Sequence, residues 1–152
     1  MEYTKPEAKS WGKENMKGLE VPVFPSFTPD LKELDEDGIR FDVNHIYANG
    51  FTSVMAAPET CGMTFEERKK FVEIVCDEAR GKMHGSASVM QDTVEEDIEM
   101  LRHIEKAGGT HATLAHPVQY YPRSEEDIFR MYEHMCDSTN CAESPRFLMS
   151  SP

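Results

Sequence analysis

Residues 51–89, FTSVMAAPETCGMTFEERKKFVEIVCDEARGKMHGSASV, decide the fold because two apolar runs flank a segment with helical spacing. Each apolar run has the length and composition of a β-strand. Between the runs, Thr64 and Glu67 form a capping box, and an apolar stripe follows them at intervals of three and four residues. Gly81 ends this predicted helix. The stretch therefore predicts a βαβ unit.

The same unit repeats along the chain. Four strand-like runs start at residues 21, 51, 82 and 111, at nearly equal spacing: Val21–Phe27, Phe51–Ala57, Lys82–Val89 and His111–Pro117. Each run precedes an amphipathic segment, and the predicted helix caps are Asp35, Thr64, Asp92 or Thr93, and Ser124. A helix with one apolar stripe covers a sheet on one side only. Four βα units therefore predict a parallel sheet with sequential strand order and its helices on one face.

Two α/β architectures fit this repeat. One is a small open sheet, and the other is a (β/α)8 TIM-barrel type of fold with about four βα units, a half-barrel. The period alone does not separate them, and no dinucleotide or Walker glycine pattern occurs. We divide the chain into an N-terminal segment, 1–19, a half-barrel, 20–140, and an irregular tail, 141–152. Trp11 and Met16 should pack a short helix of the first segment across one end.

Composition narrows the class of partner. The chain has 152 residues and a net charge of −12, so nucleic acid and anionic membranes, which select clustered Lys and Arg, are not expected partners. The N-terminus lacks the apolar region of a secretory signal. No apolar stretch is long enough to span a membrane. Four cysteines share no zinc spacing: Cys61, Cys76, Cys136 and Cys141. We expect a reduced, cytoplasmic protein without metal or cofactor.

Four stretches resemble, in order, the dihydrodipicolinate synthase and N-acetylneuraminate lyase family. They are VPVFPSFTPDLKELDEDGI from residue 21, FTSVMAAPETCGMTFEERKKFVEIV from residue 51, GSASVMQDTVEEDIEML from residue 85 and KAGGTHATLAHPVQYYPRSEEDIFRMYEHM from residue 106. The resemblance covers roughly residues 20–140 and corresponds to the N-terminal half of the family. It implies a (β/α)8 barrel that acts as a class I lyase or aldolase on pyruvate-type keto acids.

The resemblance also implies site residues. In the family, a lysine on the sixth strand forms a Schiff base, a tyrosine relays protons, and a threonine pair after the second strand helps to bind carboxylate. The threonine pair falls on Ala56 and Ala57, and the following glutamate falls on Glu59. Thr60 is a weak substrate-binding candidate. The relay tyrosine corresponds to Tyr120 or Tyr121.

The residues themselves give few catalytic candidates. Glu59 and His116 fall near the C-terminal ends of strands, where barrel sites form, and could make an acid–base pair. We prefer the interpretation that Glu59 is an ordinary loop residue and that His116 is bonded to the backbone. Of the nine lysines only Lys82 touches a predicted strand, and it lies at the N-terminal end. A fifth strand is expected near residue 141, where two prolines and several serines break the pattern.

Two functions follow as alternatives. The chain is a lyase of this family that is truncated before its catalytic strands and inactive alone, or it is a non-catalytic half-barrel that associates with itself. Four parallel strands would leave two open edges. They would also leave an inner face, for which alternation offers these candidates: Val21, Val23, Val54, Ala56, Ser86, Ser88 and Leu114. We therefore predict a homodimer or higher oligomer. A small keto acid is the other partner that the resemblance implies.

Overall fold

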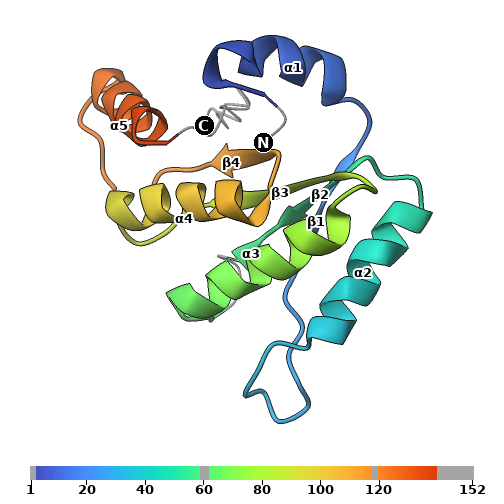
Figure 1. The fold of residues 1–152 in the computed structure, drawn as a ribbon. Coiled ribbons are helices and arrows are strands. Elements are labelled where there is room, and N and C mark those ends of the chain that lie inside the picture. Colours follow the sequence, from blue (N-terminus) through green and yellow to red (C-terminus); the bar gives the residue numbers. More distant parts are fainter. Residues whose placement is uncertain (1–2, 59–61, 118–119, 140–152) are drawn as a thin grey trace.

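A four-stranded parallel sheet forms the centre of the fold. The computed structural model describes residues 3–58, 62–117 and 120–139. The strands are β1 (Glu20–Val23), β2 (Ser53–Ala56), β3 (His84–Val89) and β4 (His111–Leu114), and they lie in the order β1-β2-β3-β4 (Figure 1). All neighbouring pairs are parallel. The predicted topology is confirmed.

The first strand is shorter than its apolar run. Val21–Phe27 was the expected strand, but β1 ends at Val23 and the chain leaves the sheet at Phe24. Phe27 then makes an isolated antiparallel bridge with Leu34 inside the β1–α2 connection. The apolar residues after Val23 therefore build a loop at the C-terminal edge instead of extending the sheet.

The helices begin and end close to the predicted positions. They are α2 (Glu36–Ala48), α3 (Phe65–Ala79), α4 (Val94–Ala107) and α5 (Glu125–Asp137). Their N-caps are Asp35, Thr64, Thr93 and Ser124, and each cap side chain accepts a hydrogen bond from a backbone N–H of the first turn. Gly108 adopts a left-handed conformation, φ +88°, and ends α4 as predicted.

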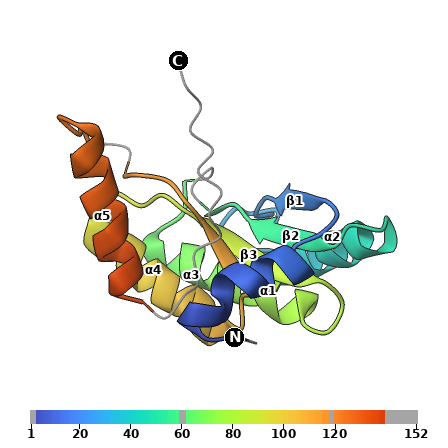
Figure 2. The ribbon, with the colours of Figure 1, turned by 90° about the horizontal axis from the view of Figure 1, so that it is seen from above.

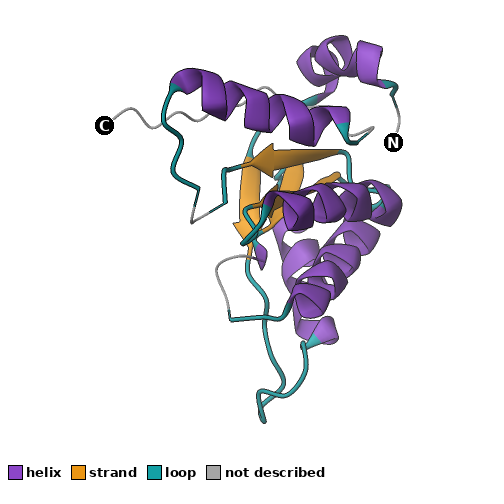
Figure 3. Cartoon of the chain, turned by 90° about the vertical axis from the view of Figure 1, so that its left-hand side faces the viewer, coloured by secondary structure: helices purple, strands orange, loops and turns teal. Residues whose placement is uncertain are grey.

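The helices of the βα units form one layer beside the sheet. Helices α2 and α3 pack together, α4 packs on α3, and α5 packs on α4. Figure 3 shows α2, α3 and α4 gathered on one side of the strands. Helices on one face fit a segment of a (β/α)8 barrel and do not fit a doubly wound sheet, which has helices on both faces. Phe71, Ile74, Leu101 and Ile104 are buried in the core between the layers.

The side chains that face away from these helices differ from the prediction. Val23, Val54 and Ala56 belong to the core that the helices cover, so they do not line the inner face. Val21 pairs with Val54, and Leu114 pairs with Val89, which places both on the same helix-facing side. Only Ser86 and Ser88 of the expected set have the inward parity. The inner face is mostly polar, so the expectation of an apolar inner face is wrong. The strand register places nine residues on it, of which only Pro22 and Met55 are apolar: Glu20, Pro22, Ser53, Met55, His84, Ser86, Ser88, His111 and Thr113.

The N-terminal segment crosses one end of the sheet. It contains η1 (Lys5–Glu7) and α1 (Ala8–Asn15) (Figure 2). The Trp11 ring meets the His84 ring edge-on, with 5.4 Å between centroids. The Tyr3 hydroxyl donates to the Thr110 carbonyl, and the Lys5 ammonium donates to the Cys136 carbonyl at 2.9 Å. These contacts hold the N-terminal segment against the N-terminal ends of β3 and β4 and against α5.

Candidate functional site

The site candidates that the structure describes follow β4 along the chain: His116, Tyr120 and Tyr121. Glu59 and Thr60 fall outside the described residues, so the expected pair of Glu59 with His116 stays a prediction. Ala56 and Ala57, which stand where the family has its threonine pair, are buried. The Ala57 N–H donates to the Val23 carbonyl at 3.1 Å. The methyl side chains of these two alanines have no hydroxyl group that could bind a carboxylate or transfer a proton.

His116 and Tyr120 come together beyond β4, and Tyr121 does not join them. The His116 and Tyr120 rings meet edge-on with 6.5 Å between centroids, and His116 is exposed. The Tyr120 hydroxyl donates to the Asp127 carbonyl of α5 at 3.0 Å. Tyr121 is 80% exposed. Tyr120 is therefore tied to the first turn of α5, whereas the imidazole of His116 is exposed.

The two lysines that are least exposed in the described ion pairs, Lys69 and Lys82, are both held by carboxylates. Lys69, on α3, is the clearest case: its side chain is only 16% exposed, but it bonds Glu66 and Glu99 on the helix surface. These hydrogen bonds raise its pKa, so they favour the ammonium over the free amine. A Schiff-base lysine needs the opposite shift, which comes from burial without an anionic partner.

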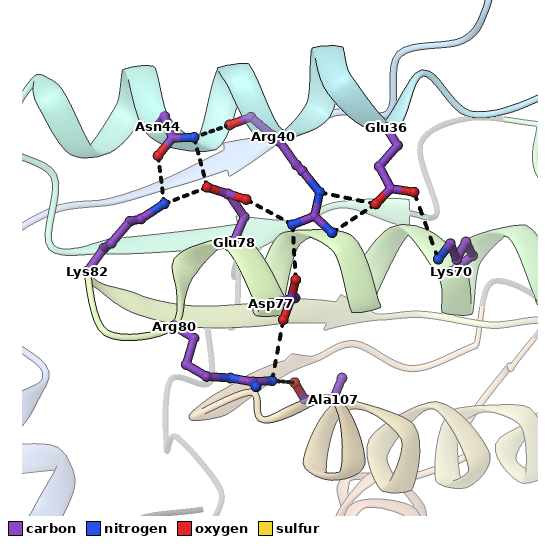
Figure 4. Close-up of polar contacts among 9 residues, drawn as sticks. All are labelled: Glu36, Arg40, Asn44, Lys70, Asp77, Glu78, Arg80, Lys82 and Ala107. Atoms are coloured by element: carbon purple, nitrogen blue, oxygen red, sulfur yellow. Dashed lines mark hydrogen bonds and ion pairs between the residues drawn. The ribbon is translucent and has the colours of Figure 1, made fainter.

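Lys82 takes part in a polar network between α2 and α3 (Figure 4). Its ammonium pairs with Glu78 and donates to Asn44 Oδ1 at 2.7 Å. Glu78 also accepts from Arg40 at 2.8 Å, and Arg40 reaches Asp77 at 3.0 Å. Hydrogen bonds from Lys82, Arg40 and Asn44 lower the pKa of Glu78 to about 2. Lys82 therefore joins the outer faces of two helices and points away from the inner face of the sheet.

A first buried polar group, which we call the inner cluster, consists of Glu20, Ser53, Ser86 and His111. Glu20 Oε1 accepts from Ser53 Oγ, Ser86 Oγ and His111 Nε2, each at 2.8 Å. Thr110 Oγ1 lies 3.0 Å from the other ring nitrogen of His111. Burial raises the pKa of Glu20, but the hydrogen bond and charge of His111 and the two serine hydroxyls outweigh it and lower the pKa to about 2. Glu20 is thus a carboxylate held by three donors.

A second group, which we call the loop cluster, consists of Arg68 on α3, Gln91 in the β3–α4 loop and Asp97 on α4. Arg68 Nη1 donates to Gln91 Oε1, and the Gln91 N–H donates to Asp97 Oδ1, both at 2.7 Å. Gln91 and Asp97 are fully buried. Burial raises the pKa of Asp97 to about 6, against the hydrogen bond from Gln91. The cluster fixes the loop that leaves β3 at the C-terminal edge.

Sequence reasoning missed both clusters. His84 and His111 are the first residues of β3 and β4, and the hydrogen bond of His111 to Glu20 gives it a structural role. One signal was available for the loop cluster. Asp97 lies on the apolar stripe of its helix, four residues before Leu101 and three after Val94, where a carboxylate is exceptional. Its burial follows from that position.

A groove lies at the opposite edge, at the N-terminal ends of the strands. It has a volume of about 770 Å³, and its lining includes Lys17, Tyr47, Arg80, Lys82, His84 and Thr110. Barrel enzymes place their chemistry at the C-terminal edge, so the size of this groove does not make it the reaction site. In the described part of the chain, no group of three or more His, Cys, Asp or Glu residues could hold a metal ion.

Comparison with known proteins agrees with this architecture. A 4-hydroxy-tetrahydrodipicolinate synthase from Chloroherpeton thalassium is 29% identical over 144 residues, which are 92% of this chain and 46% of that protein. The crystal structure of N-acetylneuraminate lyase from Fusobacterium nucleatum matches with a TM-score of 0.76 and 23% identity, over 90% of this chain and 48% of the lyase. The chain is a half-length relative of the dihydrodipicolinate synthase and N-acetylneuraminate lyase family. The family recognised from the residues is therefore confirmed, and the fold is a TIM-type half-barrel.

A third similar protein of the dihydrodipicolinate synthase family is YagE, a prophage protein from E. coli K12, whose crystal structure is in complex with pyruvate. It matches with a TM-score of 0.73 and 23% identity, over 82% of this chain and 42% of YagE. No family model matches the chain. The chain spans about half the length of the curated relatives it matches, consistent with their N-terminal half. Among the described residues, no helix is long and apolar enough to cross a membrane.

Proposed function

We propose that this chain is one half of a class I lyase or aldolase barrel for pyruvate-type keto acids, and that it does not turn over substrate alone. Similarity to 4-hydroxy-tetrahydrodipicolinate synthase, and to a relative whose structure contains pyruvate, supports the substrate class. The buried cysteines Cys76 and Cys136 support a reduced, cytoplasmic setting. Burial raises the pKa of Cys76 to about 12, so that thiol is inert at neutral pH.

The placement of the lysines carries this proposal. Imine formation begins with attack of a neutral amine on the keto carbon, so the amine must be desolvated and lie at the C-terminal edge. All nine lysines are described, and Lys69 and Lys82, the two in the densest polar surroundings, are both held by carboxylates. A complete site therefore needs an amine from outside this half-barrel.

The C-terminal edge would contribute the rim of such a site. His116 supplies an exposed imidazole, Tyr120 stands beside it, and Glu59, Thr60 and Tyr121 are the remaining candidates from the sequence. In a completed barrel these residues would face substrate groups away from the imine. We assign them no step of the imine chemistry itself.

Self-association is the second candidate function, and the edges of the sheet favour it. Among the described strands, β1 pairs only with β2 and β4 pairs only with β3. An edge strand presents unpaired N–H and C=O groups that another chain can pair. A second copy, with its β1 beside this β4, would close an eight-stranded barrel from two chains. The inner face is mostly polar, with only Pro22 and Met55 as apolar residues, so the open edges are the stronger argument for dimerisation.

Borohydride trapping tests the proposal directly. The chain is incubated with pyruvate and sodium borohydride, and its intact mass is measured beside that of a full-length synthase of the family. We expect an adduct on the full-length enzyme and none on this chain. An adduct on this chain that disappears in Lys82→Ala would contradict the proposal. Light scattering at micromolar concentration tests self-association, which a stable monomer would contradict.

A further inference from the structure

The groove at the N-terminal ends of the strands differs in charge from the rest of the molecule. It has a volume of about 770 Å³, and its walls come from the α1–β1, α2–β2, α3–β3 and α4–β4 connections. Lys17, Arg80, Lys82 and His84 belong to the lining, whereas none of the described lining residues is Asp or Glu. The whole chain has 28 acidic residues against 16 Lys and Arg. The groove is therefore a basic surface on an acidic protein.

The cations of the lining differ in how far their charge is already paired. Lys82 is held by Glu78 of the network between α2 and α3. Arg80 Nη2 lies 3.8 Å from Asp77 Oδ1, which is beyond hydrogen-bond distance, and the other oxygen of Asp77 bonds Arg40 at 3.0 Å. The Arg80 side chain is also 65% exposed. Arg80 therefore keeps N–H donors and charge that a ligand can use.

Backbone contacts place Arg80 and Lys17 at the groove. Arg80 Nη2 donates to the Ala107 carbonyl at 3.2 Å (Figure 4). A Cβ at Gly108 would lie 3.3 Å from the same nitrogen, so the guanidinium packs against this glycine of the lining. Thr52 Oγ1 donates to the Lys17 carbonyl at 2.6 Å. The Lys17 side chain is exposed and forms no ion pair with a described residue.

The rest of the lining suits the organic part of a ligand. Tyr47, which is 48% exposed, lines the groove together with Phe51 and Met83. Small-molecule sites have volumes of about 300–1,000 Å³, so this groove has room for more than one inorganic ion. A polyanion such as nucleic acid would be repelled by the net charge of −12 on the rest of the chain. The partner that fits is a small organic molecule with an anionic group.

We propose that this groove binds a small organic anion, whose phosphate or carboxylate group is held by Arg80 and Lys17 and whose organic part lies beside Tyr47. A guanidinium forms two parallel hydrogen bonds with either kind of group, and an ammonium adds a point charge. The groove lies at the edge of the sheet opposite to the one where barrel enzymes place their chemistry. The site is therefore separate from the proposed keto-acid site.

Calorimetry and NMR on the unmodified chain at low ionic strength test the proposal. The probes are adenosine monophosphate, adenosine and citrate. We expect saturable binding of adenosine monophosphate, with amide shifts at Lys17, Arg80 and Gly108, and weaker binding as salt is added, because salt screens exposed charges. Adenosine, which lacks the anionic group, should not bind. Binding of citrate as well would extend the site to carboxylates. The proposal is overturned if neither anion binds saturably, or if adenosine binds as well as its monophosphate.

Matched variants locate the site. Arg80→Gln should weaken the binding of adenosine monophosphate about tenfold, because a hydrogen bond to a charged group is lost. Arg130→Gln on α5 removes the same charge from a side chain that is 72% exposed, and it should leave the affinity unchanged.

A second variant tests the other cation. Lys17→Gln should weaken the binding of the same probe about two- to fivefold, as expected for an exposed charge pair. Thermal melts show whether each variant folds. If Arg80→Gln and Lys17→Gln both fold and bind the probe like the unmodified chain, the site is refuted. If Arg80→Gln does not fold, Lys17→Gln decides, because its side chain is exposed.

Discussion

The inner cluster and the loop cluster both bury a carboxyl group, yet they shift its pKa in opposite directions. Glu20 has three side-chain donors on one oxygen, and its pKa falls to about 2. Asp97 has one backbone donor, and its pKa rises to about 6. Burial acts the same way on both, by disfavouring charge. The number and charge of the donors decide the sign.

The two clusters also differ in completeness and in place. All four members of the inner cluster have hydrogen-bond partners, and the cluster crosses β1 to β4 near their N-terminal ends. The loop cluster leaves three atoms without a described partner and lies under the C-terminal edge. A satisfied network stabilises a sheet, whereas an incomplete one contributes less.

Removing the centre of the inner cluster should have the largest effect. Glu20→Ala leaves His111 and two serine hydroxyls buried without their shared acceptor. We expect the free energy of unfolding to fall by about 3–5 kcal/mol. Urea denaturation measures the change, with Glu14→Ala on the exposed part of α1 as the matched control. A loss as small as that of Glu14→Ala would show that the cluster contributes nothing to stability.

The second prediction concerns acid. The pKa of Glu20 is lower in the folded chain, about 2, than its ordinary value of 4.5. Its contribution is therefore fully present above pH 4.5 and is lost as the pH falls from 4.5 through 2. We expect this loss to be roughly 2–3 kcal/mol. Thermal melts between pH 2 and pH 6 measure it, and Glu20→Gln should flatten the acid side of the curve. An identical curve for the variant would contradict the assignment.

Single donors to Glu20 should matter less. Ser86→Ala removes one of the three hydrogen bonds to the carboxylate and leaves the ion pair with His111 intact. We expect destabilisation by about 1–2 kcal/mol. Ser10→Ala, whose hydroxyl donates to the Glu7 carbonyl on the exposed side of α1, is the control and should be nearly neutral. An equal loss of stability in Ser86→Ala and Ser10→Ala would contradict the expectation that the buried donor contributes more than the exposed one.

The loop cluster should give the smallest effect and the opposite pH slope. Because the folded pKa of Asp97 lies above its ordinary value of 3.8, its contribution to stability falls as the pH rises from 3.8 toward 6. Asp97→Asn should abolish this slope and change stability at pH 8 by less than about 1–2 kcal/mol. Thermal melts across this pH range measure the slope, with Glu95→Gln as the charge-matched control. A gain in stability of the wild-type chain as the pH rises would contradict the comparison.

Much of the fold was predictable from local signals. The repeat of about 30 residues gave the parallel order of the strands. The caps at Asp35, Thr64, Thr93 and Ser124 gave the helix starts, because a capping side chain acts on backbone only three residues away. The family resemblance was readable for the same reason, since its motifs follow the repeat in order.

The site was less predictable. His116 and Tyr120 were named from the sequence and do meet beyond β4, because only a short stretch of chain separates them. The inner cluster was missed because Glu20 and His111 are 91 residues apart and meet only through the register of four strands. Arg68 and Asp97 were missed because their contact with Gln91 depends on how α3 and α4 pack.

The sequence alone determined the order of the strands and helices and the ends of the helices. Alternation along a strand also divided its residues into two sets. It did not say which set faces the helices, and the apolar choice for the inner face was wrong. Only the tertiary structure decided this, because the helices bury whichever set fits their apolar stripes, and that fit depends on the pairing of strands far apart in the chain.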